Sequence, residues 1–448
     1  MVTDRYEGNW IYLKAPDGTA GNSCGSVVSG NNVTTNNAND RCNATRKSVL
    51  IYGINYAPEP TGVGKYTGEF GSYLENEGFE VEVVTAIPHY PGWVVHSGYR
   101  NCYMVEQFGR IRVARCPLFL RRQMRGIWRL MAPLSFALSS APIALWRILT
   151  KRPEVVLCIE PTLFAAPIAL LAAKITGART ILHVQDLEVD AAFGVRHLSG
   201  GLLKRLANAL ENIVLKSFDA VVTISNRMQE KIREKGIEPE RLFLVRNWVD
   251  PEKIKEQDGA CGYRAELGLS DKHFVALYAG NIGAKQALHL ILEAAISCVS
   301  EPEIVFVIVG DGPEKSKLQE QYSCLTNVRF LPVQPEKRIC ELLNLANVHL
   351  LPQDRGAADL VLPSKLGGML ASGKPCIVMA DPETELYEFL DGCAILLPSG
   401  DCAALAKAIK DVFHNNCFLP IERRQLVLSA LDASKNLSEL KTVLVKPD

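Results

Sequence analysis

Two short glycine-containing segments carry groups that could bind a phosphate. "GNIGAK" (280–285) follows an apolar run and combines exposed backbone N–H groups with the cation Lys285. "VGDGP" (309–313) also follows an apolar run, and its two glycines would let the backbone approach a ligand closely. The lysine spacing of a Walker loop is absent, and ordinary turns with a solvated lysine are the alternative. The predicted phosphate-site residues are Gly280, Asn281, Lys285, Gly310 and Gly312.

A third segment, "DRGAADLVLPSKLGGMLASGKP" (354–375), places charged and polar residues ahead of a predicted helix. We predict that Ser364 caps this helix and that Gly373 lies just beyond its end. Charges gathered at a helix N-terminus suit recognition of a diphosphate and a polar sugar, whereas a solvated connector is the alternative. The predicted contacts in this segment are Arg355, Asp359, Pro363, Ser364 and Lys365.

The segment "HVQD" (183–186) brings a carboxylate to the end of a predicted strand. His183 and Gln185 share one face of that strand, and Asp186 follows where parallel sheets bind their ligands. We predict Asp186 and His183 as the catalytic pair. For His183 alone a satisfied position in the core is the competing interpretation, so Asp186 is the stronger candidate.

The loop "YAPEPTGVGKY" (56–66) also joins a buried strand to a helix. Gly62 and Gly64 would let its backbone pass close to a ligand at the lip of a cleft. The next glycine, Gly68, comes one residue too late for the G-x-G-x-x-G fingerprint of dinucleotide binding. This spacing argues against an NAD-dependent oxidoreductase.

Apolar runs alternating with helical patterns must position these loops, and they occur twice along the chain. Such runs are typical of parallel sheets covered on both faces, so we predict two doubly wound, Rossmann-like α/β domains that face a central cleft. The predicted strands are 48–54, 80–87, 110–116, 154–160, 179–186 and 220–225, then 274–283, 303–313, 327–332, 347–354, 375–381 and 393–398.

The predicted domain organisation has four parts. Residues 1–47 form a disordered, Asn-, Gly- and Ser-rich extension, and a targeting peptide is its alternative interpretation. Residues 48–246 and 247–420 are the two α/β domains, and residues 421–448 form helices that pack back on the first domain. Each domain has room for its own core.

Composition narrows the function classes. The chain has 49 basic and 49 acidic residues, so it lacks the cationic excess of general nucleic-acid binding. Its 13 cysteines include no CxxC pair and indicate free thiols in a reducing compartment. The N-terminus lacks the pattern of a secretory signal. We therefore expect a protein of the cytoplasm or an organellar stroma that is not secreted.

One segment raises the question of a membrane. Residues 130–149 are long and apolar enough to cross a bilayer, but they hold two prolines and Arg147, which favours a buried pair of helical turns. The preceding segment "FLRRQMRGIWRL" (119–130) mixes arginines with aromatic and aliphatic side chains. We predict a peripheral membrane contact near Arg121–Arg129, with a solvated basic helix as the alternative.

Taken together, the segments resemble the retaining glycosyltransferases of family 4, which have the GT-B fold. "YAPEPTGVGKY", "LHVQDLEVDAAFG", "FDAVVTIS", "RNWVD", "GNIGAKQAL", "VIVGDGPE" and "ADLVLPSKLGGMLASGKP" occur in the order that this family uses, from about residue 48 to the end. The resemblance implies transfer of a hexosyl or deoxyhexosyl group from a UDP- or GDP-sugar to a glycan or lipid-linked acceptor. It implies neither a cofactor nor a catalytic metal.

The resemblance also implies roles for the two domains. The second domain would bind the nucleotide-sugar and the first the acceptor, with Gly62 and Gly64 near both. Lys285, together with Lys365 or Arg355, would stabilise the negative charge that develops on the leaving nucleoside diphosphate. A phosphate oxygen of that group would help to deprotonate the acceptor on the same face.

The chain departs from the family pattern at four positions. Asn281 stands where many relatives carry arginine, and Gln185 stands where they carry histidine. Leu360 and Gly368 occupy the positions of the usual glutamate pair, of which Asp359 could replace the first. These departures motivate a second hypothesis, a non-catalytic scaffold that binds a nucleotide-sugar.

Overall fold

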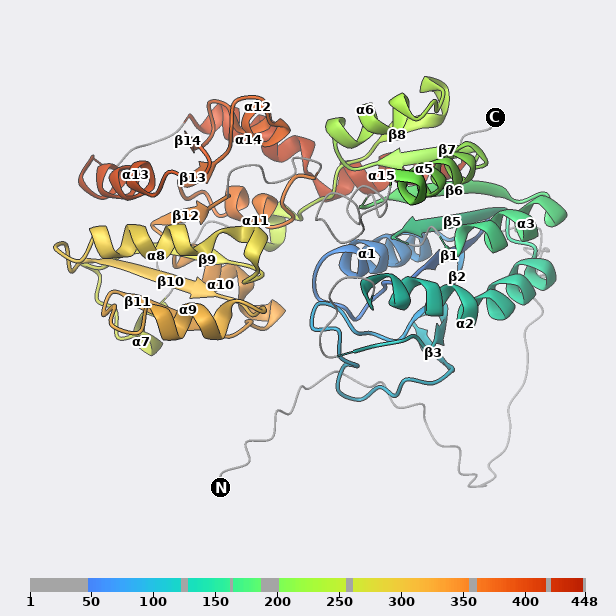
Figure 1. Cartoon of the computed structure of the whole chain (residues 1–448), viewed down its shortest axis with the longest axis horizontal. Helices are drawn as coiled ribbons and strands as arrows, with labels where there is room; N and C mark the ends of the chain where they lie inside the picture. The colour runs from blue at the N-terminus through green and yellow to red at the C-terminus, as the bar shows by residue number, and fades with distance from the viewer. Residues whose placement is uncertain are drawn as a thin grey trace, which may run out of the picture. The chain divides into compact units, whose positions relative to one another are not determined.

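A computed structural model describes residues 47–121, 128–161, 164–186, 201–254, 261–353, 361–415 and 420–445. These residues form two sheets with helices on their faces (Figure 1). Residues 1–45 make up a separate unit outside the described part, so the predicted disorder of 1–47 stays a prediction. The predicted class of two parallel α/β sheets is confirmed.

The first sheet has the strand order β3-β4-β2-β1-β5-β6-β7-β8. Only β3 runs antiparallel to its neighbour, and the other pairs are parallel. Its strands are β1 (Ser48–Gly53), β2 (Glu80–Ala86), β3 (Met104–Phe108), β4 (Ile111–Cys116), β5 (Val155–Glu160), β6 (Arg179–Val184), β7 (Ala220–Thr223) and β8 (Leu242–Leu244).

Both faces of this sheet are buried, which explains the continuous apolar runs in the sequence. Leu50 and Tyr52 point into one core and Val49 and Ile51 into the other, as the two-residue period of a strand requires. The helices are α1 (Val63–Asn76), α2 (Trp128–Lys151), α3 (Ala166–Thr176), α5 (Gly201–Lys216) and α6 (Asn226–Glu234), followed by the short 3₁₀ turn η1 (Pro239–Arg241).

The second sheet is parallel throughout and has the order β11-β10-β9-β12-β13-β14. Its strands are β9 (Phe274–Ala279), β10 (Ile304–Val309), β11 (Val328–Leu331), β12 (Val348–Leu351), β13 (Cys376–Met379) and β14 (Ile395–Leu397). The helices are α7 (Cys261–Glu266), α8 (Leu288–Ser297), α9 (Lys315–Gln321), α10 (Ile339–Asn344), α11 (Leu366–Ala371), α12 (Glu385–Leu390) and α13 (Cys402–Asn415). The 3₁₀ turns are η2 (Pro251–Lys253), η3 (Ala284–Gln286) and η4 (Glu336–Arg338).

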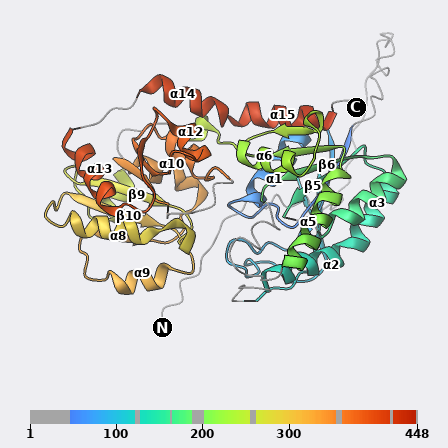
Figure 2. The same ribbon diagram turned by 45° about the horizontal axis from the view of Figure 1, so that its top comes forward.

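Two C-terminal helices, α14 (Ile421–Ala430) and α15 (Ala433–Val445), follow each other in red in Figure 2. Val427 of α14 packs in a core of the second sheet, whereas Leu440 of α15 packs in a core of the first. The chain crosses between the sheets twice, and the two crossings pair where Val249 N donates to Leu431 O at 2.8 Å. Lys441 of α15 then forms an ion pair with Glu77, 2.7 Å away.

Each of the twelve predicted strands overlaps an observed one, but β3 and β8 were missed. The β3 sequence is largely exposed and lacks a buried apolar run, and β8 is only three residues long. Residues 130–149 lie within one continuous helix, α2, that includes Pro133 and Pro142, and not in a pair of helical turns. Among the described residues, α2 alone is long and apolar enough to span a bilayer, and 44% of its apolar window is buried.

Candidate active site

The ammonium group of Lys365 lies against the loop that follows β9. Its Nζ is 3.7 Å from the centroid of the Tyr278 ring and would be 3.4 Å from a Cβ placed on Gly280. The Tyr278 hydroxyl donates to the carbonyl of Asn281 at 2.6 Å, which holds the ring beside the loop. Burial lowers the pKa of Lys365 to about 7. Two segments predicted from sequence thus meet at a desolvated amine.

The loop after β9 is held in turn by the loop after β10. Gly280 N donates to Val309 O at 2.9 Å, and Ile282 N donates to Asp311 O at 2.8 Å. A Cβ on Gly310 would lie 1.9 Å from the carbonyl oxygen of Gly280, and one on Gly312 would lie 2.3 Å from that of Ile282. These glycines therefore allow the loop after β10 to lie close against the loop after β9. They position the phosphate-site backbone, a role that the sequence did not distinguish from ligand contact.

The segment "GNIGAK" does not lead directly into an α-helix. Residues 284–286 form the 3₁₀ turn η3, Ala287 adopts a left-handed conformation with φ 47°, and α8 begins at Leu288. The left-handed residue breaks the helical hydrogen-bond ladder, which is why α8 does not begin at Lys285. The Asn281 side chain is exposed and lies within 3.3 Å of Gln286. The Lys285 side chain, Arg355 and Asp359 lie outside the described part of the chain.

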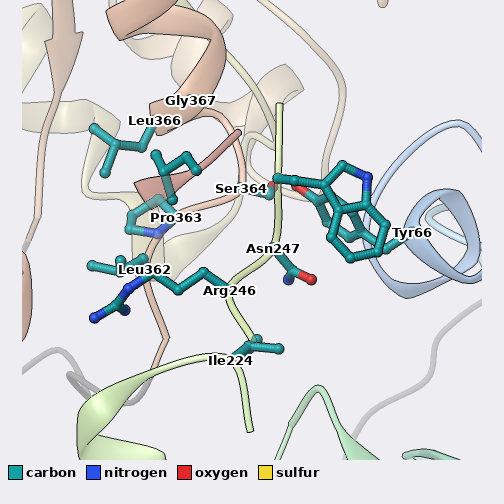
Figure 3. Close-up of a pocket in the computed structure, with 11 residues that line it drawn as sticks. Tyr66, Ile224, Arg246, Asn247, Leu362, Pro363, Ser364, Leu366 and Gly367 are labelled. Atoms are coloured by element: carbon teal, nitrogen blue, oxygen red, sulfur yellow. The ribbon is translucent and has the colours of Figure 1, made fainter. Parts of the chain in front are cut away.

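Pro363 and Ser364 line a pocket together with the "RNWVD" segment, as Figure 3 shows. The pocket is small, with a cavity volume of about 20 Å³. Ser364 does not cap α11, because the N-cap is Lys365 and the Leu366 N–H bonds to the Pro363 carbonyl at 2.9 Å. The other lining residues are Tyr66, Ile224, Arg246, Asn247, Trp248, Leu362, Leu366, Gly367 and Leu431.

His183 belongs to a buried amide network behind this pocket. Its Nε2 lies 3.0 Å from Gln185 Nε2, so the neutral ring accepts a hydrogen bond there. Gln185 and Asn247 exchange two hydrogen bonds of 3.1 and 2.9 Å. Burial lowers the pKa of His183 to about 4, which keeps the ring neutral at neutral pH. Asp186, by contrast, is exposed and follows Gln185 in the loop after β6.

The "YAPEPTGVGKY" loop is pinned to its own domain by Glu59, which sequence reasoning missed. This buried carboxylate accepts hydrogen bonds of 3.0 Å from the backbone N–H groups of His89 and Tyr90. A Cβ on Gly64 would lie 2.5 Å from Glu59 Oε2, so Gly64 makes room for the carboxylate. Gly62 is the N-cap of α1. A glutamate between two prolines in the loop after β1 was the only signal for this contact.

Glu385 is a second buried carboxylate that sequence reasoning missed. It accepts hydrogen bonds from the N–H groups of Asn226 and Arg227, each 2.9 Å long, at the start of α6. Arg246, which lines the pocket, donates to it at 2.7 Å. Ser225 caps the next free N–H of α6. Glu385 of the second half thus accepts the hydrogen bonds of free N–H groups at the start of α6 in the first half.

In the ranges that the structure describes, no three His, Cys, Asp or Glu side chains gather as metal ligands. The predicted independence from metal stays a prediction, as does the absence of a cofactor.

Comparison with known proteins agrees with this arrangement. Residues 61–248 match the glycosyl transferase 4-like domain, and residues 262–430 match glycosyl transferases group 1. WcaI of Escherichia coli (strain K12), named for glycosyl transfer in colanic acid biosynthesis, is 40% identical over 373 residues, 81% of this chain and 91% of WcaI.

Solved structures share the fold at low identity. Sucrose-phosphate synthase from Thermosynechococcus elongatus superposes with a TM-score of 0.69 at 14% identity, covering 89% of this chain and 98% of the synthase. Anabaena HepE, solved in complex with UDP and glucose, gives 0.62 at 14% identity, covering 90% and 100%. The chain therefore belongs to the family 4 glycosyltransferases of the GT-B fold and is an enzyme of the glycosyltransferase class.

Proposed function

We propose that the chain moves a sugar from a UDP- or GDP-sugar to a hydroxyl of a glycan or lipid-linked acceptor, with retention and without metal. The observation that carries the proposal is the Lys365 ammonium held against the loop at Gly280. A nucleoside diphosphate that leaves gains negative charge, and a desolvated cation stabilises that charge more than a solvated one does.

Two relatives support a UDP-sugar and a diphosphate-linked acceptor as the first compounds to test. Anabaena HepE was solved with UDP and glucose. UDP-Gal:alpha-D-GlcNAc-diphosphoundecaprenol alpha-1,3-galactosyltransferase of Escherichia coli is 27% identical over 216 residues, 46% of this chain and 53% of that enzyme. The acceptor class is accordingly proposed as a sugar on a polyprenyl diphosphate.

The proposed reaction takes place on one face of the sugar. Lys365, with Lys285 and Arg355 as further proposed donor contacts, holds the diphosphate while its bond to the anomeric carbon breaks. The acceptor oxygen attacks from the same side, and its proton passes to a phosphate oxygen of the leaving group. His183 acts through Gln185 and Asn247 on the pocket wall, so we propose it as a positioning residue beside Asp186.

A panel of labelled UDP- and GDP-sugars, offered with polyprenyl-diphosphate sugars and a metal chelator, tests the proposal. We expect transfer from one donor, with the anomeric configuration of the product read by NMR. Folded protein that neither transfers nor hydrolyses any donor would contradict it. Nucleotide binding without turnover would instead support the scaffold hypothesis. That hypothesis is motivated by Gly368, which stands where relatives carry a glutamate. The heavy atoms that a Cβ at Gly368 would meet are the methyl groups of Leu343 and Ile254.

We also propose that the enzyme works in the cytoplasm or an organellar stroma. The cysteines whose side chains the structure describes are free thiols, which suits a reducing compartment.

Donor affinity is expected to depend on pH through Lys365. Its pKa of about 7 in the free protein must rise when a diphosphate binds beside it. Below about pH 7 the amine is charged both before and after binding, so donor affinity does not change with pH. Above that pH, binding takes up a proton, and affinity falls by up to about tenfold per pH unit.

Calorimetric titration at about pH 6 and about pH 9, in buffers of different ionisation enthalpy, measures both the affinity and the proton uptake. Lys365→Arg supplies the control, because guanidinium stays protonated over this range and should remove the pH dependence. The same proton uptake in Lys365→Arg would assign the effect to another group.

A further inference from the structure

Helices α2 and α3 cover one side of the first sheet and also carry apolar side chains directed away from it. Leu134, Leu138 and Trp146 of α2 are 38%, 72% and 56% exposed, at spacings that place them on one stripe of the helix. Leu171 and Ile175 of α3 are 56% and 64% exposed. The two helices pack side by side in both Figure 1 and Figure 2. This outer face consists of Leu134, Leu138, Pro142, Trp146, Leu171 and Ile175.

The charged residues within the two helices that form the outer face have one sign. The whole chain balances 49 basic against 49 acidic residues, yet α2 and α3 contain no Asp or Glu. Arg147 is buried and paired with Glu82 at 3.1 Å, so it does not contribute to the surface. The exposed cations at the margins are Arg121, Lys151, Arg152 and Lys174.

Tryptophans mark both ends of α2. Trp128 is its first residue, and the Arg121 guanidinium lies 4.7 Å from its ring centroid. Trp146 lies near the other end and is 56% exposed. Tryptophan rings and neighbouring cations favour the headgroup level of a bilayer, where one side of the group is apolar and the other wet.

We propose that the outer face docks on an anionic lipid bilayer, with α2 lying in the headgroup layer. The helix does not span the bilayer, because its opposite face contributes Phe136 and Ile148 to the core and holds Arg147 against Glu82. The contact predicted near Arg121–Arg129 stays a prediction, because residues 122–127 lie outside the described part.

A second copy of the chain fits the outer face less well. A two-fold interface would bury the cations of this face against the same face of a second copy, and neither helix offers a carboxylate to pair with them. Anionic headgroups supply the missing negative charge. Docking does not depend on the proposed donor or reaction, and it would bring the enzyme to acceptors that are anchored in lipid.

Flotation of the full chain with vesicles tests the proposal. We expect the chain to float with phosphatidylcholine vesicles that contain about 30% phosphatidylglycerol, less with phosphatidylcholine alone, and less as salt is added. Leu138→Glu with Trp146→Glu should lower the bound fraction by about tenfold or more, because both side chains lose their apolar contact with lipid. Lys151→Glu with Lys174→Glu should remove the preference for anionic lipid.

Leu426→Glu is the matched control, since Leu426 is 60% exposed on α14 and lies on another element. It should float like the unchanged chain, and circular dichroism should show all variants folded. The proposal is overturned if the unchanged chain fails to float, or if Leu138→Glu with Trp146→Glu floats as Leu426→Glu does. If light scattering detects a dimer that Leu138→Glu dissociates, the outer face is instead an interface with a second copy of the chain. Donor binding, measured separately, has no bearing on these outcomes.

Discussion

Replacing Lys365 with methionine is expected to lower kcat/KM for sugar transfer by about 10²–10³-fold. Methionine keeps much of the length and apolar volume of the side chain, so the contact with the Tyr278 ring is largely preserved. The variant loses the charge beside Gly280, where the diphosphate is proposed to bind. A group that acts on developing charge lowers kcat as well as affinity, and steady-state kinetics with the preferred donor separates the two.

Two further variants make the Lys365 result interpretable. Lys317→Met removes a lysine of the same half that is 73% exposed and should leave kinetics unchanged. Lys365→Arg restores the charge but carries a bulkier, planar head, so partial recovery is expected. Equal rates for Lys365→Met and Lys317→Met would show that the leaving group is stabilised elsewhere, with Lys285 and Arg355 as the next candidates.

The sheets could be predicted from sequence because their strands are buried on both faces. A run such as that of β10, in which all six residues are buried, has no polar alternation to confuse it with a surface strand. The antiparallel edge strand β3 lacks this signal, since no residue in it is fully buried. An exposed edge strand is specified mainly by its neighbour, which a local pattern does not contain.

The candidate site was predictable in part. Glycine loops and cations at the carboxyl ends of parallel strands follow from general rules, and Lys365 was found in this way. Glu59 and Glu385 were missed because their partners are backbone N–H groups distant in sequence, at His89 and Asn226. Buried carboxylates are rare and need such partners, so only the folded chain identifies them.

Glu385→Ala is expected to lower the free energy of unfolding by about 3 kcal/mol. The substitution leaves the N–H groups of Asn226 and Arg227 without their acceptor and Arg246 without its buried counter-charge. An unsatisfied buried group costs more than the net value of the bond it has lost. Urea denaturation followed by circular dichroism measures the change, which should appear as a lower midpoint at a similar slope.

Glu388→Ala provides the control for Glu385, because both residues lie on α12. Glu388 is 64% exposed and 3.7 Å from the Arg227 guanidinium, and a pair of that kind is worth at most about 1 kcal/mol. Glu385→Gln should fall between the two, since its amide oxygen can still accept one of the N–H bonds while the charge opposite Arg246 is lost. If Glu385→Ala and Glu388→Ala unfold at the same midpoint, Glu385 does not hold the start of α6. Its contact with the pocket residue Arg246 would then contribute nothing measurable to the fold.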